Sequence, residues 1–193
     1  MTTIAVFAYG SLVDPASAEL TLGRRAEVVP ARLGGWRRGW SVCRDNLRVE
    51  KTFAIDHPGG EVPPFILGLS VEPDAGAGPE QGPNGALIEV SEAELERLDL
   101  RERRYRRVEV TVEVAAPVRF DRVVAFASRP EHHAPEPPAG AVILAPYLRT
   151  VEAAFDAIGE LAEFRRTTGP PPVPVVEPVL IRDEIPPGNP RGW

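Results

Sequence analysis

The chain has 193 residues, 43% of them hydrophobic, and a formal net charge of −6 at pH 7. A chain of this length can build one substantial core and bury roughly 70% of its extended surface, so one main domain is expected. The acidic balance argues against a nucleic-acid partner, because nucleic-acid binding needs a basic patch that replaces phosphate counterions.

Local features agree with these exclusions. Arginines cluster between residues 101 and 107, but glutamates flank or interleave them, and we interpret most of the cluster as solvated surface. Cys43 is the only cysteine, which excludes an internal disulfide and a cysteine zinc cluster and fits a reducing compartment. The start has no positive leader region, and no apolar stretch approaches the roughly 20 residues that span a bilayer. We therefore expect a cytoplasmic protein that does not contact a membrane.

The first part of the chain predicts strands and one short helix. Residues 4–8 form an apolar run that ends at Gly10, which is typical of a buried strand that stops at a turn. Asp14-Pro15 has the form of an N-cap followed by proline at the first helical position, and it predicts a helix through about residue 20. The Gly- and Pro-rich stretch 73–84 predicts a mobile loop. Further strands are expected at residues 28–33, 36–42 and 65–71.

The next segment is the best defined in the chain. Residues 85–90 predict a strand, and Ser91-Glu92-Ala93-Glu94 has the form of a capping box, in which the first and last side chains satisfy each other's backbone amides. A helix is therefore expected to begin at Glu92.

Glu102 stands where this helix should present a leucine. Leu95, Leu98 and Glu102 recur at i, i+3 and i+7, which places them on one helix face at 3.6 residues per turn. A carboxylate on an apolar face is costly unless it is paired or its pKa is raised, and a raised pKa is how enzymes obtain a general base near neutral pH. Two interpretations stay open: a general acid/base, or a buried ion pair with an arginine such as Arg32 or Arg37.

The remainder predicts two strands, one long helix and a tail. Valines alternate with polar residues over 108–114, the period of a half-buried strand, and residues 122–127 supply another strand. Apolar residues at helical spacing predict a helix over 146–166. Residues 1–168 thus form the predicted domain, and residues 169–193, including Pro186-Pro187, form a Pro-rich tail laid on it or left loose.

Other familiar catalytic patterns have little support. His132 and His133 lie beside prolines in a predicted loop, and His57 has no metal-ligand partner at a familiar spacing, so neither a histidine triad nor a metal site is expected. Ser11 lacks an activating base and a nucleophile-elbow motif, and we assign it a substrate hydrogen bond instead.

Several short segments together resemble the gamma-glutamylcyclotransferase-like superfamily, which includes the ChaC and AIG2-like branches. Phe7-Ala8-Tyr9-Gly10-Ser11-Leu12 and Leu98-Asp99-Leu100-Arg101-Glu102 are similar to its two signature segments. Between them, Ala31-Arg32-Leu33-Gly34-Gly35-Trp36-Arg37 and Asn84-Gly85-Ala86-Leu87 are similar to two further family segments. Tyr147 resembles a tyrosine that family members place over the substrate.

This resemblance implies an α+β fold: a small mixed β-barrel, closed or nearly closed, with flanking helices and a pocket at one end. It also implies conversion of a gamma-glutamyl amino acid, amine or glutathione to 5-oxoproline and a free amine, without a metal or organic cofactor. Glu102 would be the acid/base. The substrate-binding residues would be Tyr9, Gly10, Ser11, Leu12 and Tyr147.

The sequence departs from the family pattern after Glu102. A glycine that often follows the glutamate is absent, and Tyr105 is one residue nearer than the usual tyrosine. Three classes of function stay open: a gamma-glutamylcyclotransferase, with a slight lean toward the glutathione-associated ChaC branch; an enzyme for another amide substrate; and a binding or regulatory module without turnover.

Overall fold

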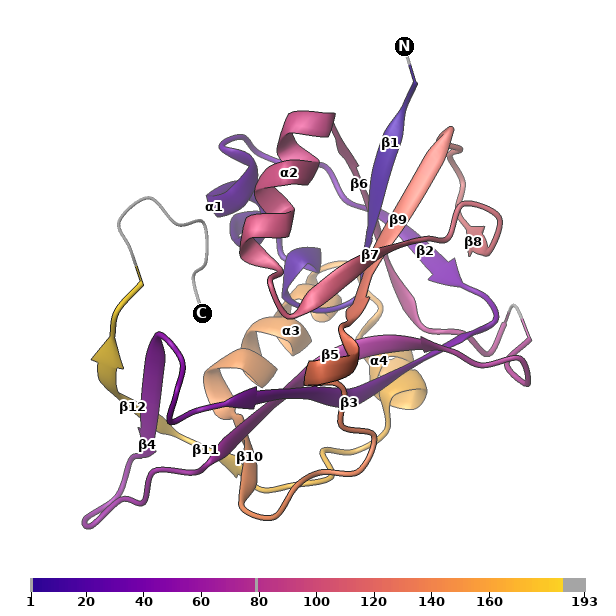
Figure 1. The fold of residues 1–193 in the computed structure, drawn as a ribbon. Helices are drawn as coiled ribbons and strands as arrows, with labels where there is room; N and C mark the ends of the chain where they lie inside the picture. Colours follow the sequence, from indigo (N-terminus) through magenta and orange to yellow (C-terminus); the bar gives the residue numbers. More distant parts are fainter. Residues whose placement is uncertain (1, 79, 186–193) are drawn as a thin grey trace.

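The computed structural model describes residues 2–78 and 80–185. Its strands form a six-stranded sheet, a four-stranded sheet and a two-stranded ribbon (Figure 1). The six-stranded sheet has the order β7 (Tyr105–Glu109), β9 (Arg122–Ser128), β1 (Ile4–Ala8), β6 (Asn84–Val90), β2 (Val29–Leu33) and β8 (Val114–Ala115). The four-stranded sheet has the order β11 (Val175–Val176), β10 (Ala141–Leu144), β5 (Phe65–Pro73) and β3 (Trp36–Asp45). The ribbon pairs β12 (Pro178–Asp183) with β4 (Lys51–Ile55).

Strand β1 lies in the centre of the larger sheet. All five of its residues are buried, and it pairs antiparallel with β6 and parallel with β9. A strand that is covered on both faces reads as a continuous apolar run, which is why residues 4–8 do not alternate. The strand ends immediately before Tyr9 and Gly10, so the larger sheet fixes where the following loop begins.

The two larger sheets curl toward each other to form a partly closed barrel. The Ser128 amide, at the end of β9, donates a 2.9 Å hydrogen bond to the Ser70 hydroxyl on β5. In Figure 1, α1 (Pro15–Leu22) and α2 (Glu92–Arg101) flank the six-stranded sheet, whereas α3 (Ala145–Ala157) and α4 (Leu161–Thr168) lie with the four-stranded sheet. The predicted α+β fold with flanking helices is confirmed.

The residues predicted to cap the first turns of α1 and α2 form these caps. The Asp14 carboxylate accepts hydrogen bonds from the Ala16 and Ser17 amides at the start of α1, and Pro15 occupies the first helical position. At the start of α2, the Ser91 hydroxyl and the Glu94 carboxylate form both halves of the capping box. The helix therefore begins at Glu92, as expected.

Two predicted elements were wrong in extent. The single helix over 146–166 is two helices, because Gly159 adopts a left-handed conformation with φ of 74° between α3 and α4. The strand over 108–114 stops at Glu109, and Val112 is 92% exposed in the turn that follows. There the Val123 amide donates to the Thr111 hydroxyl at 2.9 Å, a side-chain bond that replaces a backbone ladder bond.

The tail supplies two strands that the sequence did not predict. β11 pairs parallel with β10, and β12 pairs antiparallel with β4, which was also unpredicted. The described part of the tail therefore packs on the rest of the chain, while Pro186-Pro187 lies outside the described residues. Within residues 2–78 and 80–185, no helix has both the length and the apolar character needed to cross a membrane.

Candidate functional site

The residues predicted to form the site line two adjoining cavities. The larger has a volume of about 160 Å³ and the smaller about 50 Å³. Both are lined by Ser11, Glu102, Tyr105 and Tyr147, so they share a wall. The smaller cavity also touches the other predicted residues, namely Tyr9, Gly10 and Leu12. The fold thus brings together all six residues that the sequence singled out.

Glu102 reaches the cavities from the C-terminal end of α2. It is the C-cap rather than an interior residue of the helix, and its amide donates to the Leu98 carbonyl at 2.7 Å. Leu95 and Leu98 are buried on the face below, while the Glu102 side chain is 17% exposed. The helical spacing therefore directs this carboxylate toward the core, and the end of the helix leaves it open to a cavity.

Glu102 forms an ion pair with its sequence neighbour. Arg101 Nε lies 3.1 Å from Glu102 Oε1, and the Arg101 side chain is 8% exposed. The pairing with Arg32 or Arg37 considered above was wrong, since these arginines contact other acids, Glu163 at 2.5 Å and Glu72 at 2.8 Å. The carboxylate is thus both paired and in contact with a cavity.

Arg101 also ties Glu102 to the N-terminal loop and to α1. Its guanidinium donates to the Ser17 carbonyl at 2.7 Å, to the Ser17 hydroxyl at 2.8 Å and to the Thr21 hydroxyl at 3.0 Å. A longer bond of 3.4 Å reaches the Ser11 hydroxyl. One buried guanidinium thus fixes the relative positions of the two sequence motifs.

The loop after β1 lines the smaller cavity through Gly10, Ser11 and Leu12. Two of its carbonyls are used within the loop, because Gly10 O accepts from the Val13 amide at 3.0 Å and Ser11 O accepts from the Asp14 amide at 3.2 Å. The amides of Gly10, Ser11 and Leu12 donate to no protein group among the described residues. First-turn amides lack partners within a helix and are ready to bind a polar ligand.

All three tyrosines of the chain meet at this site. The Tyr9 hydroxyl donates to the Phe126 carbonyl, and the Tyr105 hydroxyl donates to the Leu69 carbonyl at 2.9 Å. Burial raises the pKa of Tyr147 to about 12, and the nearby Glu102 carboxylate adds to this rise. Burial likewise raises the pKa of Tyr9 and of Tyr105. The three phenols therefore stay neutral at physiological pH and keep their O–H donors.

A buried arginine that the sequence analysis did not single out holds the loop from behind. Arg38, 3% exposed, donates to the Tyr9 carbonyl at 3.2 Å and to the Asn84 carbonyl at 2.7 Å. Its guanidinium carbon lies 5.0 Å and 4.4 Å from the ring centroids of Phe155 and Phe164. Burial lowers the pKa of Arg38 to about 9. This residue joins the start of the loop to α3 and α4.

The fold of this chain is similar to that of solved structures. A structure titled "Gamma-glutamyl cyclotransferase" superposes with a TM-score of 0.58 at 14% identity, covering 91% of this chain and 94% of that chain. A crystal structure of the Homo sapiens uncharacterized protein loc79017 gives a TM-score of 0.57 at 15% identity, covering 89% and 91%. The chain has the gamma-glutamylcyclotransferase-like fold.

The other comparisons add little to this assignment. The Arabidopsis thaliana protein At3g28950.1 is 30% identical, with a TM-score of 0.41, and the match covers 66% of this chain and 63% of that chain. This chain thus spans less than two thirds of that protein's length. No family model and no curated protein matches the chain. The gamma-glutamylcyclotransferase-like assignment therefore rests on the fold.

Within this gamma-glutamylcyclotransferase-like fold, the larger cavity extends beyond the predicted residues. Its remaining wall includes Arg44 and Arg104 among apolar side chains such as Phe53, Ile66 and Leu144. Arg104 belongs to the arginine cluster that was interpreted as mostly solvated, but its side chain is only 14% exposed. No group of three or more His, Cys, Asp or Glu side chains suited to a metal ion occurs in the part of the chain that the structure describes.

Proposed function

We propose that the chain is a gamma-glutamylcyclotransferase-type enzyme, which converts a gamma-glutamyl compound to 5-oxoproline and a free amine. One observation carries the proposal: the Glu102 carboxylate and the loop of Gly10, Ser11 and Leu12 line the same small cavity. A base and a set of amide donors are the two components that this cyclisation needs. The fold shared with a structure titled "Gamma-glutamyl cyclotransferase" supports the same reaction class.

In the first step, Glu102 accepts a proton from the alpha-ammonium group of the substrate. The resulting amine attacks the gamma-carbonyl carbon of the same molecule, and the new C–N bond closes a five-membered ring. Arg101, 3.1 Å from the carboxylate, favours the ionised form that can take the proton. Because both reacting groups belong to one substrate, the site needs mainly to hold a folded conformation.

The tetrahedral intermediate then places negative charge on the former carbonyl oxygen. The amides of Gly10, Ser11 and Leu12 are suited to bind it, and one such donor is worth on the order of 3 kcal/mol. Collapse breaks the original amide bond, and Glu102 returns its proton to the departing amine. Glu102 then takes the second proton of the ring nitrogen and passes it to the same amine, which leaves as an ammonium ion and leaves Glu102 ionised. The neutral Tyr147 hydroxyl borders both cavities and can donate to a polar group of the substrate.

The test is a direct assay for 5-oxoproline from gamma-glutamyl-alanine and from glutathione. We expect Glu102→Gln to lower kcat by about 10²–10⁴-fold, the usual contribution of a general acid/base. Glu96→Gln is the matched control, because Glu96 lies on the exposed face of the same helix. Undiminished turnover in Glu102→Gln would remove the mechanism, and no product from any gamma-glutamyl compound would remove the function.

A further inference from the structure

The guanidinium of Arg38 is a buried cation, because the side chain is only 3% exposed. Among the described residues, its hydrogen bonds go to uncharged oxygens. These oxygens belong to Tyr9, Asn84, Phe164, Thr167 and Thr168. A buried charge interacts with its surroundings more strongly than a charge in water does. Since none of these partners carries a negative charge, the positive charge of Arg38 acts on the groups around it.

One of these hydrogen bonds fixes the direction of a backbone amide in the loop of residues 10–12, which we call the amide loop. Arg38 Nη1 donates to the Tyr9 carbonyl at 3.2 Å. The peptide bond between Tyr9 and Gly10 is trans, so its C=O and N–H groups lie in one plane and point in opposite directions. Because the C=O group is directed toward Arg38, the Gly10 N–H group points away from it.

The same contact makes the Gly10 amide a stronger donor. A hydrogen bond from a cation to the carbonyl of a peptide group polarises that group, and its N–H then donates more strongly. The Gly10 amide donates to no protein group among the described residues. Tyr9 and Gly10 line the smaller cavity, whereas Arg38 lines neither cavity. Arg38 therefore acts on the amide loop from behind, without reaching a ligand in the site.

The charge of Arg38 also acts on the wall of the smaller cavity. Tyr9 and Tyr147 both line this cavity. Burial raises the pKa of both phenols, and the positive charge of Arg38 opposes the rise. A cation that favours the anionic form of two side chains in the wall also favours negative charge on a ligand between them.

We propose that Arg38 is a positioning residue for the cyclisation, which directs the Gly10 amide toward the oxyanion of the tetrahedral intermediate and strengthens its hydrogen bond. The proposal rests on the proposed function, because that reaction supplies the oxyanion. Arg38 acts through the peptide group between Tyr9 and Gly10. The negative charge on the oxygen develops only during the reaction, so the contribution of Arg38 falls on kcat more than on KM.

The test measures kcat and KM for gamma-glutamyl-alanine in Arg38→Met, which keeps a long side chain but removes the donor and the charge. We expect kcat to fall by about tenfold to a hundredfold with little change in KM, since complete loss of one oxyanion donor costs about 10²–10³-fold. Arg38→Lys keeps the charge without the planar fork, and its kcat should be intermediate. A wild-type kcat per folded molecule in either variant would overturn the proposal.

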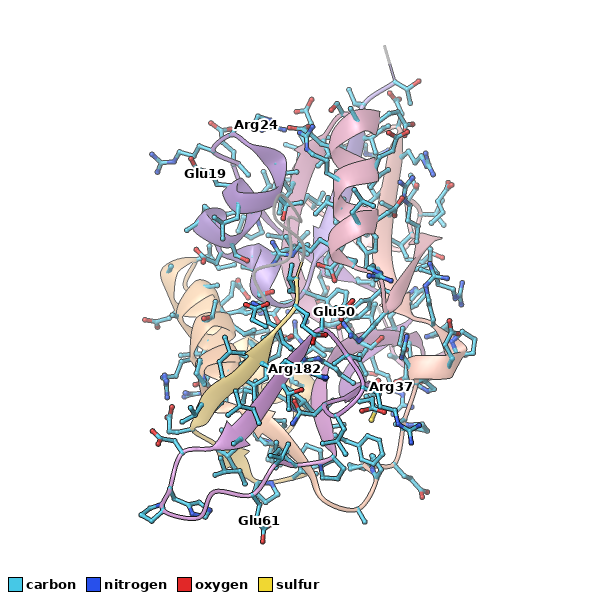
Figure 2. All side chains as sticks on the ribbon, turned by 60° about the vertical axis from the view of Figure 1, so that its left-hand side comes forward. Glu19, Arg24, Arg37, Glu50, Glu61 and Arg182 are labelled. Carbon is cyan, nitrogen blue, oxygen red and sulfur yellow. The ribbon has the colours of Figure 1, made fainter. Side chains whose placement is uncertain are left out.

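Two control variants separate positioning from stability. Arg37 is the neighbour of Arg38 on β3, but it lies at the surface and pairs with Glu72 at 2.8 Å (Figure 2). Arg37→Gln should leave kcat unchanged. Phe155→Leu removes a buried ring beside Arg38 and should lower stability, while the hydrogen bond to the Tyr9 carbonyl remains. An equal loss of kcat in Phe155→Leu would attribute the effect to stability alone and overturn the proposal.

A measurement without turnover separates this proposal from the proposed function. Residual dipolar couplings in NMR spectra report the orientation of the Gly10 N–H bond in the wild-type protein and in the Arg38 variants. A change of orientation that Arg37→Gln does not produce supports the role of Arg38. The same change in a protein whose wild type forms no 5-oxoproline would overturn the proposed function alone. An unchanged orientation in a protein whose wild type forms 5-oxoproline would overturn the role of Arg38 alone.

Discussion

Arg101 and Glu102 are adjacent in the sequence, and their side chains form an ion pair with Nε 3.1 Å from Oε1 at the cavity wall. The helix ends between them, because Arg101 is the last residue of α2 and Glu102 is its C-cap. Residues one apart within a helix point in directions about 100° apart, so a contact between them depends on the departure of the chain from helical geometry. The end of the helix therefore helps to form the site.

From this pair we predict that Arg101→Gln lowers kcat for 5-oxoproline formation by about tenfold or more, with the fold retained. Without the guanidinium, Glu102 loses its orientation and a cation that favours the carboxylate. The acid limb of the pH profile of kcat/KM should consequently move to higher pH. Steady-state kinetics between pH 5 and 8 measures both effects.

The control for this prediction lies one turn earlier on the same helix. Arg97 also donates to carbonyls of α1, at 3.1 Å from Thr21 O and 2.7 Å from Leu22 O, but it does not line either cavity. Arg97→Gln should lower stability without moving the pH profile. An unshifted acid limb in Arg101→Gln would contradict the positioning role.

Local sequence signals were sufficient to predict the position of Glu102. The capping box at Ser91 sets the start of α2, and the spacing of Leu95 and Leu98 then sets its buried face, so the direction of residue 102 follows. The apolar run of β1 likewise fixes where the loop at Gly10 begins. Short-range patterns were sufficient here because residues adjacent in the sequence mark where each of these elements begins or ends.

Contacts between distant segments were not predictable in this way. Arg101 belonged to the cluster interpreted as solvated, and no sequence pattern pointed to Arg38. Both arginines are nevertheless buried, by segments up to 130 residues away, such as Thr168 beside Arg38. Tyr105, the first residue of β7, lines both cavities because of where the pairing with β9 places this strand, which periodicity does not reveal. β12 was not predicted because its proline-rich surroundings suggested an extended tail. Its partner strand β4 was not predicted either.

Arg38 provides a prediction about stability. Arg38→Met keeps a long side chain against Phe155 and Phe164 but leaves the Tyr9 and Asn84 carbonyls without the donor they have now. Unsatisfied buried carbonyls cost about 1–3 kcal/mol, so we expect a loss of roughly that size in the free energy of unfolding. Urea denaturation measures it, and an unchanged midpoint would show that the guanidinium is dispensable.

Glu163 provides a prediction about pH. Arg166 lowers the pKa of this carboxyl to about 2 against the effect of burial, and Arg32 on β2 adds to the decrease. A carboxyl with a depressed folded-state pKa contributes stability above its unfolded value of 4.5, and this contribution is lost as pH falls toward 2. Wild-type protein should therefore be more stable than Glu163→Gln at pH 7, and the difference should shrink between pH 4.5 and 2. Urea midpoints that differ equally at both ends of this range would contradict the assignment.

The C-terminal strand provides the last prediction, because Arg182 joins β12 to the segment before β4. Arg182→Gln removes its bonds to the Leu47 and Val49 carbonyls and to the Thr52 hydroxyl at 3.1 Å. Hydrogen exchange over residues 46–55 should speed up, since these bonds hold that segment closed. KM should rise several-fold with a smaller change in kcat, because Glu102 and the amide loop belong to other elements.

Arg149→Gln is the matched control for the strand. Arg149 also contacts the tail, through an exposed ion pair with Glu177, but exposed pairs contribute less than about 1 kcal/mol. It should leave exchange over 46–55 and KM nearly unchanged. Equal results for Arg182→Gln and Arg149→Gln in both measurements would contradict a role for β12 in holding residues 46–55. A change in Arg182→Gln alone would support the prediction that β12 helps to shape the larger cavity.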